Sequence, residues 1–330
     1  MSRDEFDRIN DYFKPLVAEN SGALDLTDDV AMIDGSQVIC SKDLLVEGVH
    51  FPLGEPKDYV ARRALRTALS DIAAKGGKPT GYLVGCVWPP DASEDDFRMF
   101  AEGLAEDQAV FGCTLLGGDT TAHVVRDAPF TVSVTVFGNV TRSKLVSRAG
   151  ATVGDAVFVS GSIGDGYLGL KALLDEDIGI DQESDRQYLI ERFRLPTPRF
   201  DYSDCLLACA SASIDISDGL IADAKHISSA SKVQIRIKAS SIPVSEPAGR
   251  WIATSQDQEA ALVGLACSGD DYELMFTVPQ DRLSTLFGMA NQRGLTPHKI
   301  GTVSKGSGVV VEDRSGNSLP VGRGGYNHFS

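Results

Sequence analysis

The stretch TLLGGDTTAHVVRDAPFTVSVTVFGNV, residues 114–140, indicates the fold of the first half of the chain. Its second part, residues 130–140, alternates apolar and small polar side chains, which is the period-two pattern of a half-buried β-strand. Its first part follows an apolar run with two glycines, a carboxylate and two hydroxyls. Taken alone, that ending predicts a strand that stops in a glycine turn, with Asp119 and Thr120 as turn residues.

Helix and strand patterns alternate on the N-terminal side of this stretch. They predict a helix near residues 4–19, a strand at residues 37–45 and a helix that begins near Pro56. A strand at residues 81–89 and an acidic helix that ends near Phe111 follow. This part of the chain is therefore expected to form a mixed sheet with helices packed on it.

A polar stretch, residues 141–155, joins this part to a second unit with its own strands and helices. The second unit begins with a strand at residues 156–161 and continues with a helix at residues 167–176. We therefore predict an α+β protein of two domains, residues 1–145 and residues 146–330.

Composition excludes several classes of protein. The chain has 330 residues, 42% of them hydrophobic, which is enough for two domains with their own cores. The net charge of −15 repels phosphodiester backbones, so no nucleic-acid partner is expected. No apolar run approaches the ~20 residues that span a bilayer, and the start MSRDEFDRIN lacks the apolar core of a secretory signal. We therefore expect a cytoplasmic protein without a membrane partner, whose six cysteines are mostly buried free thiols.

Two nucleotide-binding motifs do not fit this sequence. The segment GDGYLG, residues 164–169, matches GxGxxG, but no parallel strand with a ribose-binding acid follows at the required distance. A strand-to-helix turn that needs small residues is the better interpretation. The Walker pattern GxxxxGK[ST] is absent, because Gly77 and Lys78 form the only GK pair and a proline follows them.

Acidic residues recur beside Ser, Thr or Gly in at least five separated segments. They are Asp28 and Asp29 in TDDVAM, Asp43 in SKDLLVEGVHF, Asp71 in LSDIAAKG, Asp119 in GGDTT, Asp215 and Asp218 in DISDGL, and Asp270 and Asp271 in SGDDYEL. Each acid alone could be a turn residue, a helix cap or a solvated side chain. Carboxylates among small residues also suit Mg²⁺, which takes hard oxygen ligands and is usually shared with substrate phosphates. The recurrence favours the metal interpretation.

Taken together, these motifs resemble the thiamine-monophosphate kinase family, in the superfamily shared with aminoimidazole ribonucleotide synthetase. The matching segments are TDDVAM, SKDLLVEGVHF, LSDIAAKG, GGDTT, SRAGATVGD, PTPR, DISDGL, DDYEL and GYNHF, in the family's order from about residue 25 to residue 329. The resemblance implies transfer of the γ-phosphoryl group of ATP onto thiamine monophosphate, giving thiamine diphosphate and ADP. It also implies a two-domain synthetase-like α+β fold, a homodimer built through the N-terminal ATP- and metal-binding domain, and several Mg²⁺ ions in place of a P-loop.

The resemblance assigns roles to individual residues. The matches to magnesium ligands are Asp29, Ser41, Lys42, Asp43, Asp71, Asp119, Asp215 and Asp218. The matches to ATP contacts are Gly118, Asp119, Arg148 and Ser217, and the matches to thiamine contacts are His50, Asp270 and Tyr326. No catalytic base is assigned beyond the metal ligands, because the attacking phosphate oxygen is already ionised and phosphoryl transfer depends on positioning and charge neutralisation.

The sequence departs from the family pattern at three positions. Lys42 stands where the family usually has Thr, Asp270 replaces a glutamate, and Thr27 replaces a glycine before the paired acids. Lys42 could still offer its backbone carbonyl to a metal. Two alternatives remain open: a sibling ATP-dependent synthetase of the selenophosphate or purine-pathway type, or a non-catalytic nucleotide- or metal-binding relative. The selenophosphate enzymes usually carry a reactive cysteine near the N-terminus, whereas none precedes Cys40 here.

Overall fold

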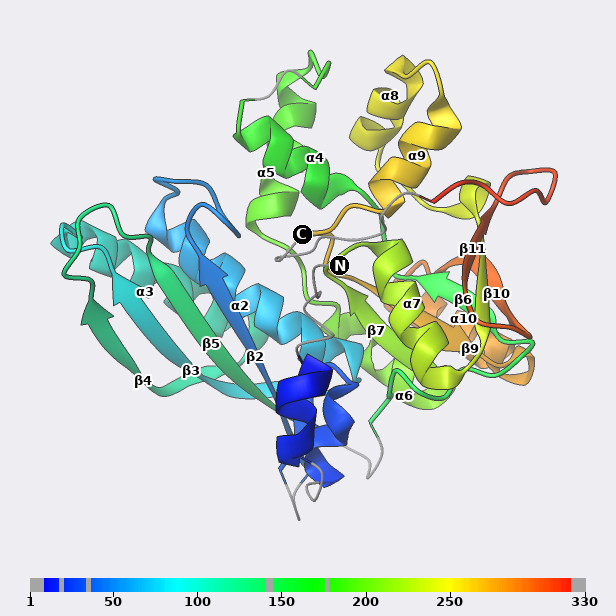
Figure 1. The fold of residues 1–330 in the computed structure, drawn as a ribbon, viewed down its shortest axis with the longest axis horizontal. Coiled ribbons are helices and arrows are strands. Elements are labelled where there is room, and N and C mark those ends of the chain that lie inside the picture. The colour runs from blue at the N-terminus through cyan, green and yellow to red at the C-terminus, as the bar shows by residue number, and fades with distance from the viewer. Residues whose placement is uncertain (1–8, 18–20, 34–36, 141–144, 176–177, 322–330) are drawn as a thin grey trace.

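The computed structural model describes residues 9–17, 21–33, 37–140, 145–175 and 178–321, which form two α/β units side by side (Figure 1). The first unit contains a five-stranded sheet in the order β1-β2-β5-β3-β4. Its strands are β1 Ala31–Met32, β2 Val38–Val46, β3 Lys78–Trp88, β4 Thr114–Ala122 and β5 Thr131–Asn139. The strand β5 pairs antiparallel with β2 and β3, whereas β3 and β4 are parallel, so the sheet is mixed as predicted.

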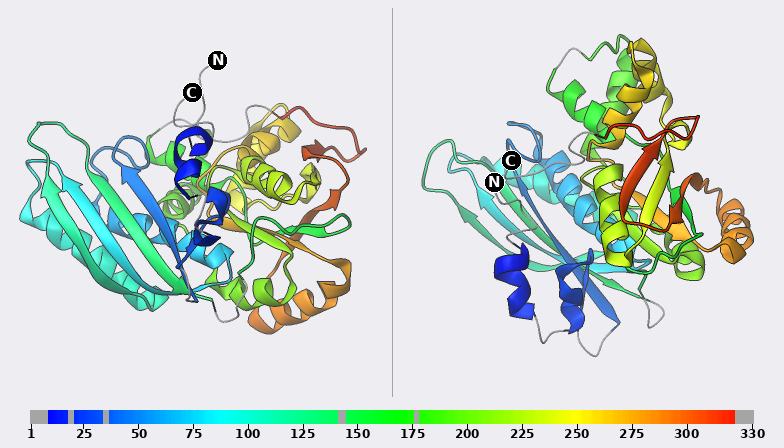
Figure 2. Two further views of the ribbon diagram at one scale, coloured as in Figure 1. Left: turned by 60° about the horizontal axis from the view of Figure 1, so that its bottom comes forward. Right: turned by 45° about the vertical axis from the view of Figure 1, so that its right-hand side comes forward.

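Two long helices cover one face of this sheet (Figures 1 and 2). They are α2 Lys57–Ala74 and α3 Glu94–Phe111. Helix α3 begins with a capping box in which Ser93 and Asp96 satisfy each other's backbone N–H groups, and it ends at Gly112 in the left-handed conformation. The alternating residues Val132, Val134 and Val136 of β5 are fully buried in the core under the helices. The period-two pattern thus predicted both the strand and its buried face.

The second unit has a six-stranded sheet in the order β11-β8-β10-β6-β9-β7. Its strands are β6 Ala156–Val159, β7 Ala212–Ile216, β8 Gln234–Lys238, β9 Glu273–Val278, β10 His298–Ser304 and β11 Gly308–Glu312. Its helices are α4 Asp165–Leu173, α5 Glu183–Arg194, α6 Ser203–Cys209, α7 Leu220–Ser231, α8 Glu246–Thr254, α9 Gln258–Ala266 and α10 Leu283–Arg293. Strands β6, β7 and β9 are buried along their whole length, because helices cover both faces of this part of the sheet.

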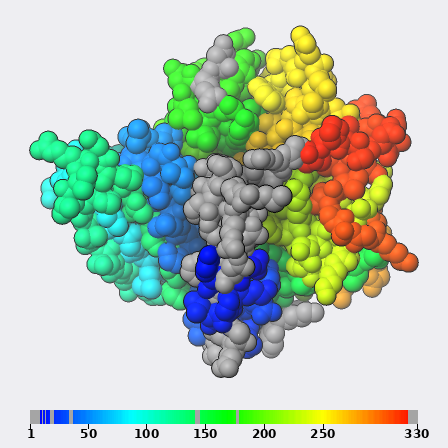
Figure 3. Space-filling view, viewed as in Figure 1, coloured from blue at the N-terminus to red at the C-terminus, as the bar shows by residue number. Residues whose placement is uncertain are grey.

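Short helical segments complete the fold. They are Ile9–Phe13, Lys14–Val17, Ser21–Leu26, Phe200–Tyr202, Ala239–Ser241 and Gln280–Arg282. The helix predicted at residues 4–19 is therefore two short π and 3₁₀ segments in its described part, and its ends lie outside the described residues. In the space-filling view this N-terminal segment, in dark blue, lies low on the face between the two units (Figure 3).

The GGDTT segment is a strand rather than a turn. Strand β4 continues through both glycines to Ala122, which makes the predicted glycine turn wrong. Gly118 is needed for close strand approach, because a Cβ there would lie 1.9 Å from the carbonyl oxygen of Val84 on β3. Asp119 therefore projects from the middle of an edge strand.

Other predictions from sequence can be compared directly with the fold. Strand β6, which precedes GDGYLG, pairs antiparallel with β9 and β10, so the parallel βαβ unit of a dinucleotide site is not formed there. All six cysteines are free; four are buried, and Cys40 and Cys267 are partly exposed. Among the described helices, none combines the length and apolar character required to cross a bilayer.

Candidate active site

A cavity of about 550 Å³ lies between the two units and draws its lining from both. The first unit contributes residues of β2 and α2, and the second contributes α4 and the loops after β7 and before β9. Ten of the lining residues are charged, hydroxyl or imidazole groups that matter below: Asp43, His50, Arg63, Thr67, Asp71, Asp215, Ser217, Asp218, Asp270 and Tyr272.

Three aspartates from distant parts of the chain meet beside this cavity. Asp29, Asp71 and Asp215 each present a carboxylate oxygen, and these oxygens lie within 4.8 Å of one another. They come from the segment before β1, from α2 and from β7. The Ser41 hydroxyl lies 2.5 Å from Asp71 Oδ2 and 3.0 Å from the Asp29 carbonyl oxygen. This set of hard oxygen donors fits Mg²⁺.

The carboxylates of this cluster repel one another. Burial, with the charges of Asp215, Asp43 and Asp29, holds the pKa of Asp71 well above its usual value. Burial and the nearby Asp29 raise the pKa of Asp215 to about 7, and burial also raises the pKa of Asp43. A divalent cation among them would relieve this repulsion and favour the ionised forms.

Asp29 differs from the other carboxylates of the cluster because two side-chain cations, Lys75 and Arg148, pair with it. Burial opposes its ionisation, but Lys75 and Arg148 outweigh burial and keep the pKa of Asp29 below its usual value. Arg148 Nε donates to Asp29 Oδ1 at 2.7 Å, and the Lys75 ammonium pairs with Asp29 Oδ2. The predicted metal ligand Asp29 and the predicted ATP contact Arg148 are thus ion-paired with each other.

Helix α2 lines one side of the cavity with Arg63, Thr67 and Asp71, and Lys75 at its C-terminal cap continues this row beyond the lining. Arg63, Thr67, Asp71 and Lys75 follow one another at intervals of four residues, so they form a stripe about 18 Å long at the helical rise of 1.5 Å per residue. Arg63 pairs with Asp270, a hydrogen bond from Thr67 favours the ionised form of Asp43, and Lys75 pairs with Asp28 and Asp29. The stripe therefore joins the predicted thiamine contacts at one end to the predicted metal ligands at the other.

Two buried aspartates, Asp223 and Asp271, fix the loops of the second unit; the sequence motifs did not single out Asp223 and placed Asp271 only among the acids suited to a metal. Asp223 Oδ2 accepts the backbone N–H groups of Ser217, Asp218 and Gly219 at 3.1–3.2 Å, which shapes the DISDGL loop. Asp271 accepts the N–H of Gly164 at 2.8 Å.

The GDGYLG segment serves packing against the DDYEL loop. Besides the bond from Gly164, Asp271 accepts the N–H of Gly166 at 3.2 Å. A Cβ at Gly166 would lie 2.1 Å from the carbonyl oxygen of Asp270. The glycines of this motif are thus required by a loop that follows about a hundred residues later, a relationship that periodicity cannot reveal.

Some predicted site residues lie away from the cluster. The strand register puts Asp119 opposite Gly85, and Gly85 opposite Ser133, on the face of the first sheet that α2 and α3 do not cover. The Lys42 ammonium donates to Ser133 Oγ at 2.6 Å on that same outer face, whereas Ser41 and Asp43 face the helices. Tyr326 lies outside the described residues.

The remaining predicted residues lie at the cavity. Ser217, Asp218 and Asp270 line it from the second unit, and His50 lines it from the first. His50 Nδ1 accepts the N–H of Val46 at 3.0 Å, so the proton of the neutral imidazole is on Nε2. Arg63 and Lys75 had no predicted role, because a buried cation on a helix has the same sequence pattern as a solvated one.

Comparisons with known proteins agree with this arrangement. Residues 27–140 match the family model of the AIR synthase related protein, N-terminal domain, and residues 152–314 match the C-terminal domain of the same family. The chain is 38% identical to the thiamine-monophosphate kinase of Caulobacter vibrioides over 98% of this chain and 90% of that protein. It is 33% identical to the thiamine-monophosphate kinase of Salmonella typhimurium over 100% of this chain and 99% of that protein.

A solved structure of AaThiL complexed with AMPPCP and TMP is also similar. It superposes with a TM-score of 0.84 at 31% sequence identity, covering 99% of this chain and 97% of that one. The crystal structure of thiamine monophosphate kinase from Aquifex aeolicus gives a TM-score of 0.75 at 30% identity, covering 89% of this chain and 92% of that one. The predicted two-domain α+β fold is thereby confirmed.

Proposed function

The chain belongs to the thiamine-monophosphate kinase family, and we propose that it transfers the γ-phosphoryl group of ATP onto thiamine monophosphate at a site completed by Mg²⁺. The observation that carries the Mg²⁺ part is the convergence of Asp29, Asp71 and Asp215 within 4.8 Å. When bound there, Mg²⁺ would neutralise the charge that develops on the transferred phosphoryl group. The chain's own residues hold, orient and separate the two substrates.

The proposed metal ligands lie along the Asp71–Lys75 half of the α2 stripe. Asp71, Asp29 and Asp215 form the centre of the proposed ligand set, with Ser41 and Asp43 beside them on β2 and Asp218 on the DISDGL loop. The backbone of Lys42 completes the set on β2, since its side chain is on the outer face. Helix α2 carries Asp71 and the buried strand β7 carries Asp215, and these rigid elements favour the fixed geometry that phosphoryl transfer requires.

We assign the nucleotide to the Lys75 end of the stripe. Arg148 and Ser217 are the proposed ATP contacts, and the Asp223 carboxylate orients the Ser217 backbone. Arg148 has a planar fork of donors that suits a phosphate, and 20% of its side chain is exposed. Arg148 can therefore reach a nucleotide while its Nε still touches Asp29.

Thiamine monophosphate belongs at the Arg63 end of the stripe. His50 presents an Nε2 proton there, and Asp270 presents a carboxylate beside the ring of Tyr272, which lines the same cavity. A carboxylate and an aromatic face suit the cationic thiazolium ring, with a cation–π contribution of about 0.5–2 kcal/mol. Tyr326 stays a prediction at this end.

A homodimer would complete the site with Asp119 and Gly118 from the partner. The outer face of the first sheet exposes Leu44 (52%), Leu83 (38%) and Leu116 (62%), and β4 is an edge strand. Such an apolar face beside an unpaired edge is suited to a second copy of the chain. Asp119 lies on this outer face, remote from the cluster of its own chain, so pairing of the sheets offers it a route into the partner's site.

The proposed function also includes the limits of the two domains and the cellular compartment. We assign residues 1–145 to the N-terminal metal-binding and dimerisation domain and residues 146–330 to the C-terminal domain. Six free cysteines fit a reducing cytoplasm that also supplies ATP.

The test is turnover by the purified protein with ATP and Mg²⁺, with and without thiamine monophosphate. ADP release that depends on thiamine monophosphate, with thiamine diphosphate identified by chromatography and loss of both on chelation, is the expected result. ATP binding without product from this substrate would instead favour a sibling synthetase or a binding-only relative.

A further inference from the structure

We infer that Arg63 is a positioning residue that assembles the thiamine end of the cleft by tying His50 of the first unit to Asp270 of the second. The inference deepens the proposed function and rests on it. Among the cavity-lining residues in the described part of the chain, Arg63 is the only lysine or arginine. Its side chain is nevertheless only 4% exposed. It is therefore a built-in part of the cavity wall.

The guanidinium group of Arg63 contacts three segments that are far apart in the sequence. Nε donates to the His50 carbonyl at 3.3 Å, Nη2 pairs with Asp270 Oδ1, and Nη1 donates to the carbonyl of Phe193. The plane of the group lies over the Phe193 ring, 3.9 Å from its centroid. All three guanidinium nitrogens and one face of the guanidinium plane thus contact other parts of the protein. Arg63 therefore holds these segments together, and we call this set of contacts the Arg63 clamp.

Asp270 is held by one contact to its backbone and by the Arg63 contact to its carboxylate. Its φ is +73°, and that of Tyr272 is +50°, which are conformations that non-glycine residues adopt only when their surroundings hold them. The backbone of Asp270 is held by its N–H bond to the Ser217 carbonyl at 2.8 Å. Arg63 is the cation that holds its carboxylate, so it determines where Asp270 points within the cavity.

His50 is held at the same clamp from the other side. Its imidazole orientation comes from the bond between Val46 N–H and Nδ1, and its backbone accepts from Arg63 Nε. Because both partners attach to one planar group, the separation between His50 and Asp270 is fixed by the width of a guanidinium. A lysine has a single ammonium and cannot reproduce this planar, three-directional contact.

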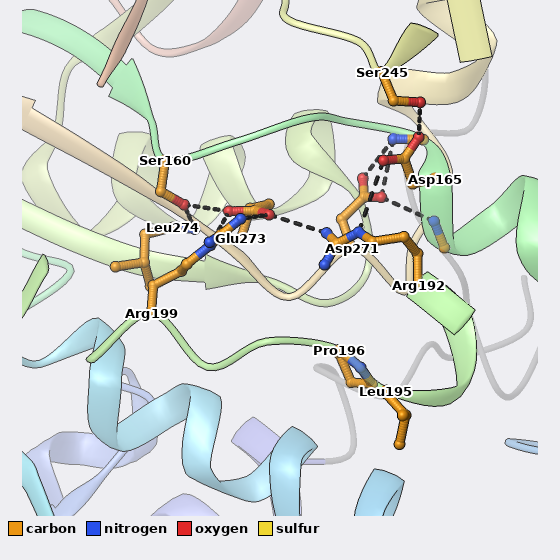
Figure 4. A network of polar contacts seen from close by, with 12 residues as sticks. Ser160, Asp165, Arg192, Leu195, Pro196, Arg199, Ser245, Asp271, Glu273 and Leu274 are labelled. Atoms are coloured by element: carbon orange, nitrogen blue, oxygen red, sulfur yellow. Dashed lines mark hydrogen bonds and ion pairs between the residues drawn. The ribbon is translucent and has the colours of Figure 1, made fainter. Parts of the chain in front are cut away.

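Residues 193–196, which contact the first unit, are held in place by other side chains besides Arg63. Arg66 Nη1 donates to the Pro196 carbonyl at 3.1 Å, and Arg194 pairs with Glu55 at 2.5 Å. Within the second unit, Arg192 before this segment and Arg199 after it both bind Glu273 and so hold the segment in place (Figure 4). The two units therefore stay joined when Arg63 is changed, and loss of Arg63 acts at the thiamine end of the cleft.

The experiment compares Arg63→Lys and Arg63→Met with Arg62→Met. Arg62 neighbours Arg63 on α2 but pairs with Glu106 and Asp107 and is absent from the cavity lining. We expect KM for thiamine monophosphate to rise about tenfold or more in both Arg63 variants, with KM for ATP within about twofold of wild type. The Arg62 variant should leave both constants unchanged.

Two further readouts separate positioning from general structural damage. Asp270→Asn breaks the pair from the other side, and its effect on KM for thiamine monophosphate should be non-additive with that of Arg63→Met. Added guanidinium ion, below denaturing concentrations, should partly restore binding of thiamine monophosphate to Arg63→Ala.

The outcomes distinguish this inference from the proposed function. A wild-type protein that makes no thiamine diphosphate overturns the proposed function and the inference together. An active wild type whose Arg63 variants keep their KM for thiamine monophosphate, or lose affinity for both substrates equally, overturns the inference alone.

Discussion

The ammonium group of Lys75 lies 2.7 Å from Asp28 Oδ1, and the side chains of both residues are almost completely buried. Lys75 also pairs with Asp29 and donates to the Ser213 carbonyl at 2.8 Å, so its three N–H groups all have acceptors. This lysine supplies a fixed positive charge to one side of the cluster that contains Asp71 and Asp215. The protein therefore neutralises the Asp28 and Asp29 side of the cluster itself, and under the proposed function a divalent cation would neutralise Asp71 and Asp215.

Replacing Lys75 by methionine should destabilise the protein strongly in the absence of metal. The change keeps the volume but leaves the carboxylates of Asp28 and Asp29 buried without this partner, a loss of about 3–5 kcal/mol in the free energy of unfolding. Urea unfolding in the presence of a chelator measures it, with Lys78→Met at an exposed position as the control. Added Mg²⁺ should recover part of the loss. A Lys75→Met protein as stable as wild type would show that Arg148 alone holds the pair.

Removing the Asp223 carboxylate should weaken ATP binding selectively. Asp223→Ala leaves three N–H groups of the Ser217–Gly219 loop without their common acceptor, so the proposed ATP contact Ser217 loses its orientation. We expect KM for ATP to rise about tenfold, with a smaller change for thiamine monophosphate. Steady-state kinetics with each substrate varied in turn provides the measurement, and Ser229→Ala on the exposed side of α7 is the matched control. Equal effects on both substrates would argue against a nucleotide-specific loop.

His226 should make the protein sensitive to mild acid. Burial, with the positive charges of Arg148 and Lys225, lowers the pKa of His226 to about 4, although Asp29 acts in the opposite direction. The unfolded chain therefore binds a proton more readily than the folded one, and stability falls as the pH drops from about 6.5 to 4. His226→Gln should reduce this loss by up to roughly 3 kcal/mol. Unfolding curves across this pH range test it; a parallel decline in both proteins would assign the acid sensitivity to other groups.

Local sequence patterns predicted where helices and strands form better than they predicted which segments pack against one another. The alternation in β5 and the acidic start of α3 predicted strands, helices and their buried faces, because those features depend on neighbours along the chain. The segment GGDTT, taken alone, predicted a turn, whereas Gly118 is required by the close approach of β3, a contact across the sheet. The burial of Lys75 and the clamp at Arg63 also depend on segments more than a hundred residues away.

The residues of the candidate site were likewise predicted only in part, because their directions depend on contacts between distant segments. Family motifs pointed to Asp29, Asp71 and Asp215 as candidate metal ligands, and the structure brings their carboxylates together. The motifs did not reveal that Asp119 lies on the other face of the sheet, because side-chain direction in a strand depends on register. That separation leads to the last prediction.

Asp119 should act on the active site of the partner subunit. Asp119→Asn and Asp71→Asn are each expected to reduce activity severely as homodimers. After joint unfolding and refolding, half of randomly mixed dimers are heterodimers, and each heterodimer contains one site with both wild-type aspartates. Activity should then return to about a quarter of the wild-type value. If the mixture stays as inactive as its parents while co-purification of differently tagged subunits shows that they have exchanged, Asp119 does not act across a dimer. A full-activity Asp119→Asn homodimer would remove Asp119 from the site altogether.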